Sequence, residues 1–124
     1  MANKVKVDLG NNSYNITMIE DFKDSVKRFV SSTESQCMLI TQENIFDLYK
    51  NQFNDLSNIS NVNIFLIDEG EKAKSFDSTI SIVNEMADKR FDRSSLVLAI
   101  GGGVVGDIAG FAASIYMRGV KYIQ

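Results

Sequence analysis

The stretch Leu96-Val97-Leu98-Ala99-Ile100-Gly101-Gly102-Gly103-Val104-Val105-Gly106-Asp107 decides the fold of this 124-residue chain. Its first five residues form an apolar run typical of a buried strand, and the residues after the glycines predict a helix from Val104 to about Met117. Glycines let the backbone adopt positive φ and approach a ligand closely, while unpaired amides at a helix start attract an anion. The stretch therefore predicts a turn that holds a diphosphate, and a nucleotide as the ligand.

Three of these glycines also match a dinucleotide-binding pattern. Gly101, Gly103 and Gly106 occupy its first, third and sixth positions. In the usual fold this pattern lies in the first strand-to-helix turn and precedes an acidic residue by about 20 positions, whereas here it comes late in the chain. The match alone is weak, and a turn needed only for tight packing of strand against helix remains the alternative.

Strands and helices alternate along the rest of the chain. Apolar runs predict interior strands at Met38–Thr41 and Val62–Ile67, and Tyr122-Ile123-Gln124 looks like the start of another strand. Apolar residues at helical spacing predict the helices. These are expected at residues 22–30, 45–53 and 75–91, and the last has Phe76, Ile80, Val83 and Ala87 on one stripe and a polar opposite face.

The chain begins with a different pattern. Val5, Val7 and Leu9 alternate with polar residues, and so do Tyr14, Ile16 and Met18 beyond a Gly-Asn-Asn turn, which predicts a β-hairpin. The expected fold is thus one α/β domain over residues 1–124. It has a Rossmann-like parallel sheet with helices on both faces and an amino-terminal hairpin.

Composition excludes several classes of function. A net charge of −3 gives no electrostatic reason to expect nucleic acid or an acidic membrane as a partner. The sequence has no histidine, so no complete zinc site is expected, and its one cysteine, Cys37, lies in an apolar run typical of a core. No signal-peptide pattern precedes the hairpin, and a cytoplasmic location is expected.

Ligands of parallel α/β sheets bind at the carboxyl ends of the strands. Three loops are expected there, namely Thr41–Asn44, Asp68–Lys74 and Gly101–Asp107. The second loop contains acids and amines around one glycine. Its carboxylates could accept hydrogen bonds from ribose hydroxyls, and an ammonium could lie beside phosphate oxygens, although a solvated charge cluster is the alternative.

Two of these loops together resemble the amino-terminal region of the 3-dehydroquinate synthase family, within the sugar phosphate cyclases. The resemblance rests on Glu69-Gly70-Glu71-Lys72-Ala73-Lys74-Ser75, on Gly101 to Ala113 and on Tyr116-Met117-Arg118-Gly119-Val120. It implies an enzyme, a carbon-oxygen lyase of the shikimate pathway. Such an enzyme converts the seven-carbon sugar acid phosphate DAHP to 3-dehydroquinate with loss of phosphate, as a homodimer that uses NAD and a divalent metal, zinc or cobalt.

The resemblance also implies roles for individual residues. Glu69, Gly70, Glu71 and Lys74 would hold ribose and adjacent groups, and Asp107 would bind through its carboxylate on the nicotinamide side. Arg118 would contact the substrate phosphate, in the site of its own or of a neighbouring subunit, with a surface arginine as the alternative. The backbone around the diphosphate would come from Gly102, Gly103, Val104, Val105 and Gly106.

The chain departs from the family pattern at several points. Glu69 replaces an aspartate, and Gln42 stands where an acidic residue often touches the adenosine ribose. The 124 residues contain none of the family's metal ligands, which belong to a helical carboxyl-terminal domain. We therefore expect a fragment without catalytic residues of its own, inactive alone and weak in its affinity for NAD.

Other interpretations remain open. Residues 96–117 could form a membrane-spanning helix, although Asp107 and the adjacent glycines disfavour it. A metal-dependent polyol dehydrogenase, a cyclase that makes cyclitols and a noncatalytic nucleotide-binding module share many of the same features.

Overall fold

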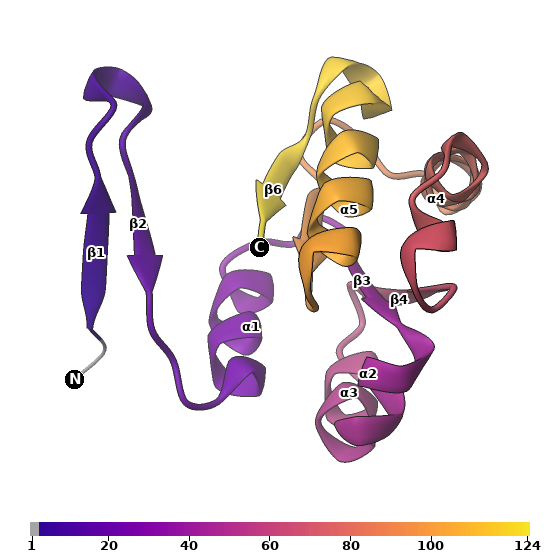
Figure 1. The fold of residues 1–124 in the computed structure, drawn as a ribbon, viewed down its shortest axis with the longest axis horizontal. Helices are drawn as coiled ribbons and strands as arrows, with labels where there is room; N and C mark the ends of the chain where they lie inside the picture. The colour runs from indigo at the N-terminus through magenta and orange to yellow at the C-terminus, as the bar shows by residue number, and fades with distance from the viewer. Residues whose placement is uncertain (1–2) are drawn as a thin grey trace.

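The computed structural model describes residues 3–124 as a parallel α/β domain preceded by a hairpin. Figure 1 shows that α4 and α5 lie side by side, while the hairpin stands apart from them. The strands are β1 (Lys4–Val7), β2 (Tyr14–Thr17), β3 (Cys37–Gln42), β4 (Val62–Ile67), β5 (Leu96–Ala99) and β6 (Lys121–Ile123). The α-helices are α1 (Phe22–Ser31), α2 (Glu43–Leu48), α3 (Lys50–Ser57), α4 (Phe76–Asp88) and α5 (Gly103–Ile115).

The main sheet has the strand order β4-β3-β5-β6, and each neighbouring pair is parallel. β3 lies in the interior of the sheet and is buried at every position, which agrees with its continuous apolar sequence. Gln42 at its carboxyl end pairs with Ile67 of β4. The loops after β3, β4 and β5 therefore leave the sheet at the same edge.

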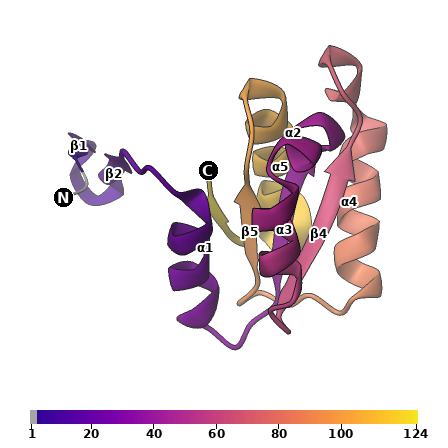
Figure 2. The same cartoon turned by 90° about the horizontal axis from the view of Figure 1, so that it is seen from below.

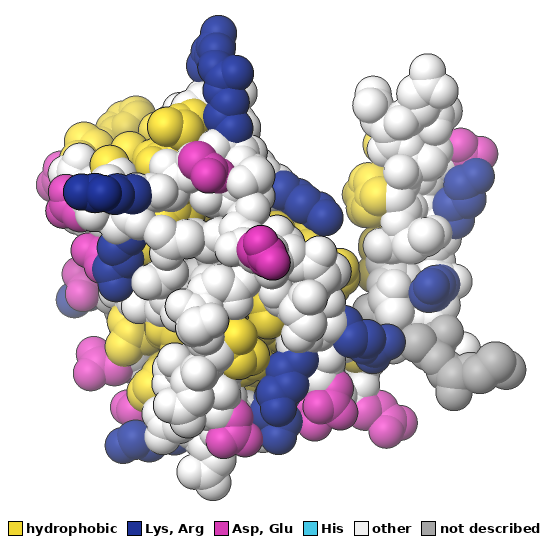
Figure 3. All heavy atoms as spheres, turned by 180° about the vertical axis from the view of Figure 1, so that it is seen from behind, with side chains coloured by type: hydrophobic (Ala, Val, Ile, Leu, Met, Phe, Trp, Pro, Cys, Tyr) yellow, Lys and Arg dark blue, Asp and Glu magenta, His cyan; other side chains and the backbone are white. Residues whose placement is uncertain are grey.

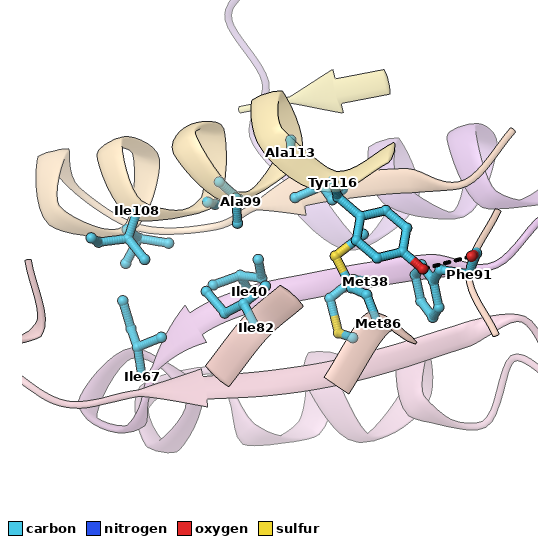
Figure 4. Close-up of a cluster of buried hydrophobic side chains, with 14 of the residues drawn as sticks. Met38, Ile40, Ile67, Ile82, Met86, Phe91, Ala99, Ile108, Ala113 and Tyr116 are labelled. Atoms are coloured by element: carbon cyan, nitrogen blue, oxygen red, sulfur yellow. Dashed lines mark hydrogen bonds between the residues drawn. The ribbon is translucent and has the colours of Figure 1, made fainter. Parts of the chain in front are cut away.

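Helices cover both faces of this sheet, as predicted. Alternate residues of β3 point to opposite faces, so Met38 and Ile40 belong to a core with α4 and α5, whereas Cys37 and Leu39 pack toward α1 and α3. Figure 4 shows the first core, in which the hydroxyl of Tyr116 donates a hydrogen bond of 2.6 Å to the carbonyl of Phe91. This bond ties the end of α5 to the segment that follows α4.

Cys37 is fully buried, in agreement with a core role. Burial raises the pKa of its thiol to about 11, which keeps the group protonated near neutral pH.

The hairpin is a separate two-stranded sheet in which Val5 pairs with Ile16 and Val7 with Tyr14. Figure 2 shows it at one side of the main sheet, joined through the segment before α1. Figure 3 shows it clear of the body along most of its length, with apolar side chains on the side that faces the gap. Val5, Tyr14 and Ile16 are about half exposed.

Two predictions about the helices are wrong. The expected helix over residues 45–53 is two helices, α2 and α3, because Tyr49 has non-helical angles of φ −118° and ψ 33°. In α4, the predicted stripe begins with Phe76 and Ile80, which are 75% and 53% exposed. The buried face consists of Thr79, Ile82 and Met86 instead.

Residues 96–117, considered above as a membrane-spanning helix, form β5, a glycine turn, α5 and a terminal turn. Within residues 3–124, no helix has both the length and the apolar character needed to cross a bilayer.

Candidate functional site

The amino terminus of α5 lies directly after the glycine turn and has no side-chain cap. The amide of Gly106 donates to the carbonyl of Gly102 at 3.1 Å. The amides of Gly103, Val104 and Val105 have no hydrogen-bond acceptor within residues 3–124, and the first turn contains no acidic residue. Three donors and the positive end of a 13-residue helix therefore remain available to an anion.

The glycines of the turn differ in what surrounds them. A Cβ added to Gly101 would lie 2.6 Å from Val105 Cγ2 and 3.1 Å from Ile45 Cδ1. A Cβ added to Gly102 or Gly103 would meet no atom within 4 Å. Packing thus explains the first glycine, whereas the open space beside the other two is room for a ligand close to the backbone.

Gly106 and Val105 face the protein interior. The Val105 side chain is fully buried, so only its backbone can contact a ligand. A Cβ on Gly106 would meet the side-chain amide of Gln124, and the carbonyl of Gly106 accepts a hydrogen bond of 2.9 Å from the Tyr122 hydroxyl. Gly106 therefore provides space for the Gln124 side chain, and its amide already donates to the carbonyl of Gly102.

The loop after β4 reaches α5 from the other side of β3. Gly70 has φ 76°, and the short 3-10 helix Glu71–Ala73 follows it. Ala73 is buried against the core of α4 and α5, while the side chains of Glu69 and Glu71 are exposed. The structure thus fixes one end of the loop and leaves its carboxylates accessible at the carboxyl edge of the sheet.

Lys74 and Asp107 join this loop to α5. Lys74 Nζ lies 2.6 Å from Asp107 Oδ2, and both side chains are about half exposed. The pKa of Lys74 is raised above its ordinary value. The largest cause is the hydrogen bond to Asp107, followed by the charge of Asp107 and then by the charge of Glu71. Lys74 and Asp107 adjoin a hollow of about 260 Å³ between α4 and α5, next to Phe76 and Phe111. The rings of Phe76 and Phe111 meet edge to face, with centroids 6.1 Å apart.

We expect Asp107→Asn to lower the pKa of Lys74 toward its ordinary value, because the neutral amide removes the charge that stabilises the ammonium. A raised lysine pKa stabilises the fold at pH values below the unfolded pKa, and this contribution is lost as the pH rises through the folded pKa. NMR titration of the Lys74 side chain would measure the change. An unchanged Lys74 titration would contradict the ion pair.

Gln42 belongs to the first of the three predicted loops, Thr41–Asn44, but its side chain turns toward the second loop, Asp68–Lys74. Its Nε2 donates to the carbonyl of Asp68 at 3.0 Å, and the residue is 9% exposed. The neighbouring Thr41 is fully buried, and its Oγ1 has no hydrogen-bond partner within residues 3–124.

Arg118 is not brought to this edge of the sheet. It lies beyond the carboxyl end of α5, and a helix of 13 residues separates it from the glycine turn by about 20 Å. Met117 and Arg118 both have positive φ, at 48° and 66°, and Gly119 follows with φ 116°. Left-handed conformations at two non-glycine residues are uncommon and store strain.

A larger hollow of about 390 Å³ lies elsewhere, beside the link between the hairpin and α1. None of the candidate ligand-binding residues lines it. Among residues 3–124, no three His, Cys, Asp or Glu side chains form a group that could hold a metal ion.

The sheet and its covering helices define a parallel α/β protein, and its fold is similar to that of solved sugar phosphate cyclases. 2-Deoxy-scyllo-inosose synthase, solved with carbaglucose-6-phosphate, NAD⁺ and Co²⁺, matches 97% of the chain with a TM-score of 0.79 at 20% identity. 2-Epi-5-epi-valiolone synthase from Streptomyces hygroscopicus, solved with NAD⁺ and Zn²⁺, matches 76% with a TM-score of 0.65 at 29% identity. The chain covers 34% and 27% of those two structures.

Sequence comparison assigns the family. The model described as 3-dehydroquinate synthase N-terminal matches residues 64–124. The chain is 40% identical to the 3-dehydroquinate synthase of Ruminiclostridium cellulolyticum over 121 residues, and equally to that of Dictyoglomus thermophilum. These alignments cover 95% and 98% of the chain but 34% and 33% of the relatives. The chain belongs to the 3-dehydroquinate synthase family, and it spans about a third of the length of these relatives.

Proposed function

We propose that the chain is the NAD-binding part of an enzyme that converts DAHP to 3-dehydroquinate with loss of phosphate. The observation that carries the proposal is the row of three free amides at the start of α5, beside open space at Gly102 and Gly103. A diphosphate fits there because its oxygens can accept from all three amides without a side chain in the way. The 40% identity to proteins named 3-dehydroquinate synthase supports this substrate over that of the cyclitol-forming relatives.

In this proposal each residue acts by binding and orientation. The amides of Gly103, Val104 and Val105 hold the diphosphate, and Glu69 and Glu71 accept hydrogen bonds from ribose hydroxyls. Asp107 binds the second ribose. Lys74 holds the carboxylate of Asp107 in position and lies near the phosphates. NAD, when bound, supplies reversible hydride transfer.

A divalent metal does not fit the described residues, because residues 3–124 offer no cluster of candidate ligands. We therefore propose no catalytic residue in this chain. We expect the chain by itself to form no 3-dehydroquinate from DAHP, even with NAD and zinc added. Appearance of that product in the assay would contradict this expectation.

A chimera tests the proposed activity directly. This chain would replace the aligned 121 residues of the Ruminiclostridium cellulolyticum protein. We expect the chimera to release phosphate and form 3-dehydroquinate from DAHP in the presence of NAD, and the same chimera with Gly103→Ala to lose that activity. A folded chimera that binds NAD yet forms no 3-dehydroquinate would instead favour a noncatalytic module or a polyol dehydrogenase.

A further inference from the structure

We propose that Gln42 is a positioning residue, which holds the acidic loop over the site by donating its side-chain amide to the backbone of Asp68. The inference deepens the proposed function and rests on it. It concerns the loop that carries Glu69 and Glu71, and it gives Gln42 a role other than direct contact with the ribose.

The position of Gln42 makes a direct ligand role unfavourable. The residue ends β3 on the face shared with Met38 and Ile40, and its side chain is nine-tenths buried beneath the loop. It directly precedes α2, but its side chain does not cap that helix. Its side-chain NH2 group donates to the Asp68 carbonyl at 3.0 Å, and this bond holds the buried side chain against the backbone of the loop.

The bond acts at the point where the loop leaves the sheet. Gln42 pairs with Ile67, the last residue of β4, and Asp68 follows at once. The far end of the loop is fixed by buried Ala73 and by the Lys74–Asp107 ion pair. With Gln42 the loop is held at both ends, and the exposed carboxylates of Glu69 and Glu71 lie between the two attachments.

The bond to Asp68 requires a hydrogen-bond donor on the side chain of residue 42. A carbonyl accepts hydrogen bonds and cannot donate them, so the side chain of residue 42 must be the donor. A carboxylate would place two acceptors against each other and would lose the bond unless it were protonated. The glutamine is therefore suited to hold the loop, which an ionised acid at the same position could not do.

The first test uses the chain without ligand. In Gln42→Met, which keeps the length of the side chain but removes the donor, we expect faster hydrogen exchange at the loop amides of Ala73, Lys74 and Ser75. These amides bond within the loop to Gly70, Glu71 and Ala73. Exchange in β3 and β4 should not change. Equal loop exchange in the two proteins would overturn the proposal, whether or not the chain binds NAD.

The second test separates two ligands. We expect Gln42→Met to weaken NAD binding about 3- to 10-fold, the range that one hydrogen bond supports, and to leave inorganic pyrophosphate binding at α5 unchanged. Gln36→Met is the matched control, because Gln36 also donates to a backbone carbonyl, that of Lys89, at the opposite edge of the sheet. This control should bind both ligands normally. Absence of NAD binding by the unchanged chain would contradict the proposed function. The hydrogen-exchange measurement on the loop amides would still decide the role of Gln42.

The third test uses Gln42→Glu. At pH 8 the carboxylate of this variant should weaken NAD binding relative to the unchanged chain. The ratio of the two NAD affinities should return toward one as the pH falls through the carboxyl pKa, ordinarily about 4.3. Protonation restores a donor to the Asp68 carbonyl, so recovery at low pH supports the proposal. Tighter binding of NAD by Gln42→Glu at pH 8 would overturn it, because the position would then act as a direct ligand of the ribose.

Discussion

Gly103→Ala is expected to abolish most NAD binding while leaving the fold intact. An added Cβ meets no protein atom within 4 Å, so the folded chain has room for it. It would instead occupy the space in which phosphate oxygens approach the amides of Gly103, Val104 and Val105. Hydrogen bonds to charged groups contribute about 1.5–3 kcal/mol each, so losing one or more should weaken binding at least about tenfold. Calorimetric titration with NAD would measure this loss.

Stability separates this effect from misfolding. Alanine is favoured over glycine in a helix by up to about 1 kcal/mol, so the urea midpoint of Gly103→Ala should stay the same or rise. Gly110→Ala is a matched control on the same helix, where the added Cβ would lie 3.4 Å from the Tyr122 ring, an ordinary contact. It should bind NAD normally. Normal binding by Gly103→Ala would show that the diphosphate lies elsewhere.

In contrast to Gly103→Ala, Gly101→Ala is expected to cause a clear loss of stability. Its Cβ would lie 2.6 Å from Cγ2 and 3.0 Å from Cβ of the fully buried Val105. Overpacking of this kind costs about 1–3 kcal/mol, because the β-branched side chain has few alternative positions. Urea denaturation would measure the free energy of unfolding.

A double variant identifies the cause. Val105→Ala removes the methyl groups that obstruct the new Cβ, although by itself it leaves a cavity. If the contact is responsible, Gly101→Ala/Val105→Ala should lose less stability than the sum of the two single variants, and this difference is the coupling energy. Strict additivity would mean that the turn adjusts without involving Val105.

The sheet was predictable from sequence because buried parallel strands are nearly continuous apolar runs. Val62–Ile67 was predicted with its observed bounds, whereas β3 extends one residue beyond its prediction at each end and β5 ends one residue earlier than predicted. The three loops at one edge followed from the parallel order. The functional assignments of Glu69, Gly70, Glu71, Lys74, Asp107 and Arg118 remain predictions.

What sequence could not supply depends on neighbours in space. Periodicity marked one apolar stripe on α4, but the core took the adjacent face with Thr79, Ile82 and Met86. The glycines of the turn look alike in sequence, and only the atoms around each Cβ distinguish Gly101 from Gly102. The bond from Gln42 to Asp68 joins residues 26 positions apart, so no local pattern could indicate it.

The hairpin divides this small protein into two cooperative units of unequal strength. Its Val5–Ile16 and Val7–Tyr14 pairs lie outside both hydrophobic cores, and two strands alone are marginally stable in water. The hairpin can therefore fray at little cost in free energy while the four-stranded sheet, with a core on each face, stays closed. Transient local opening would then begin at the amino terminus and spare the edge of the sheet where the glycine turn lies.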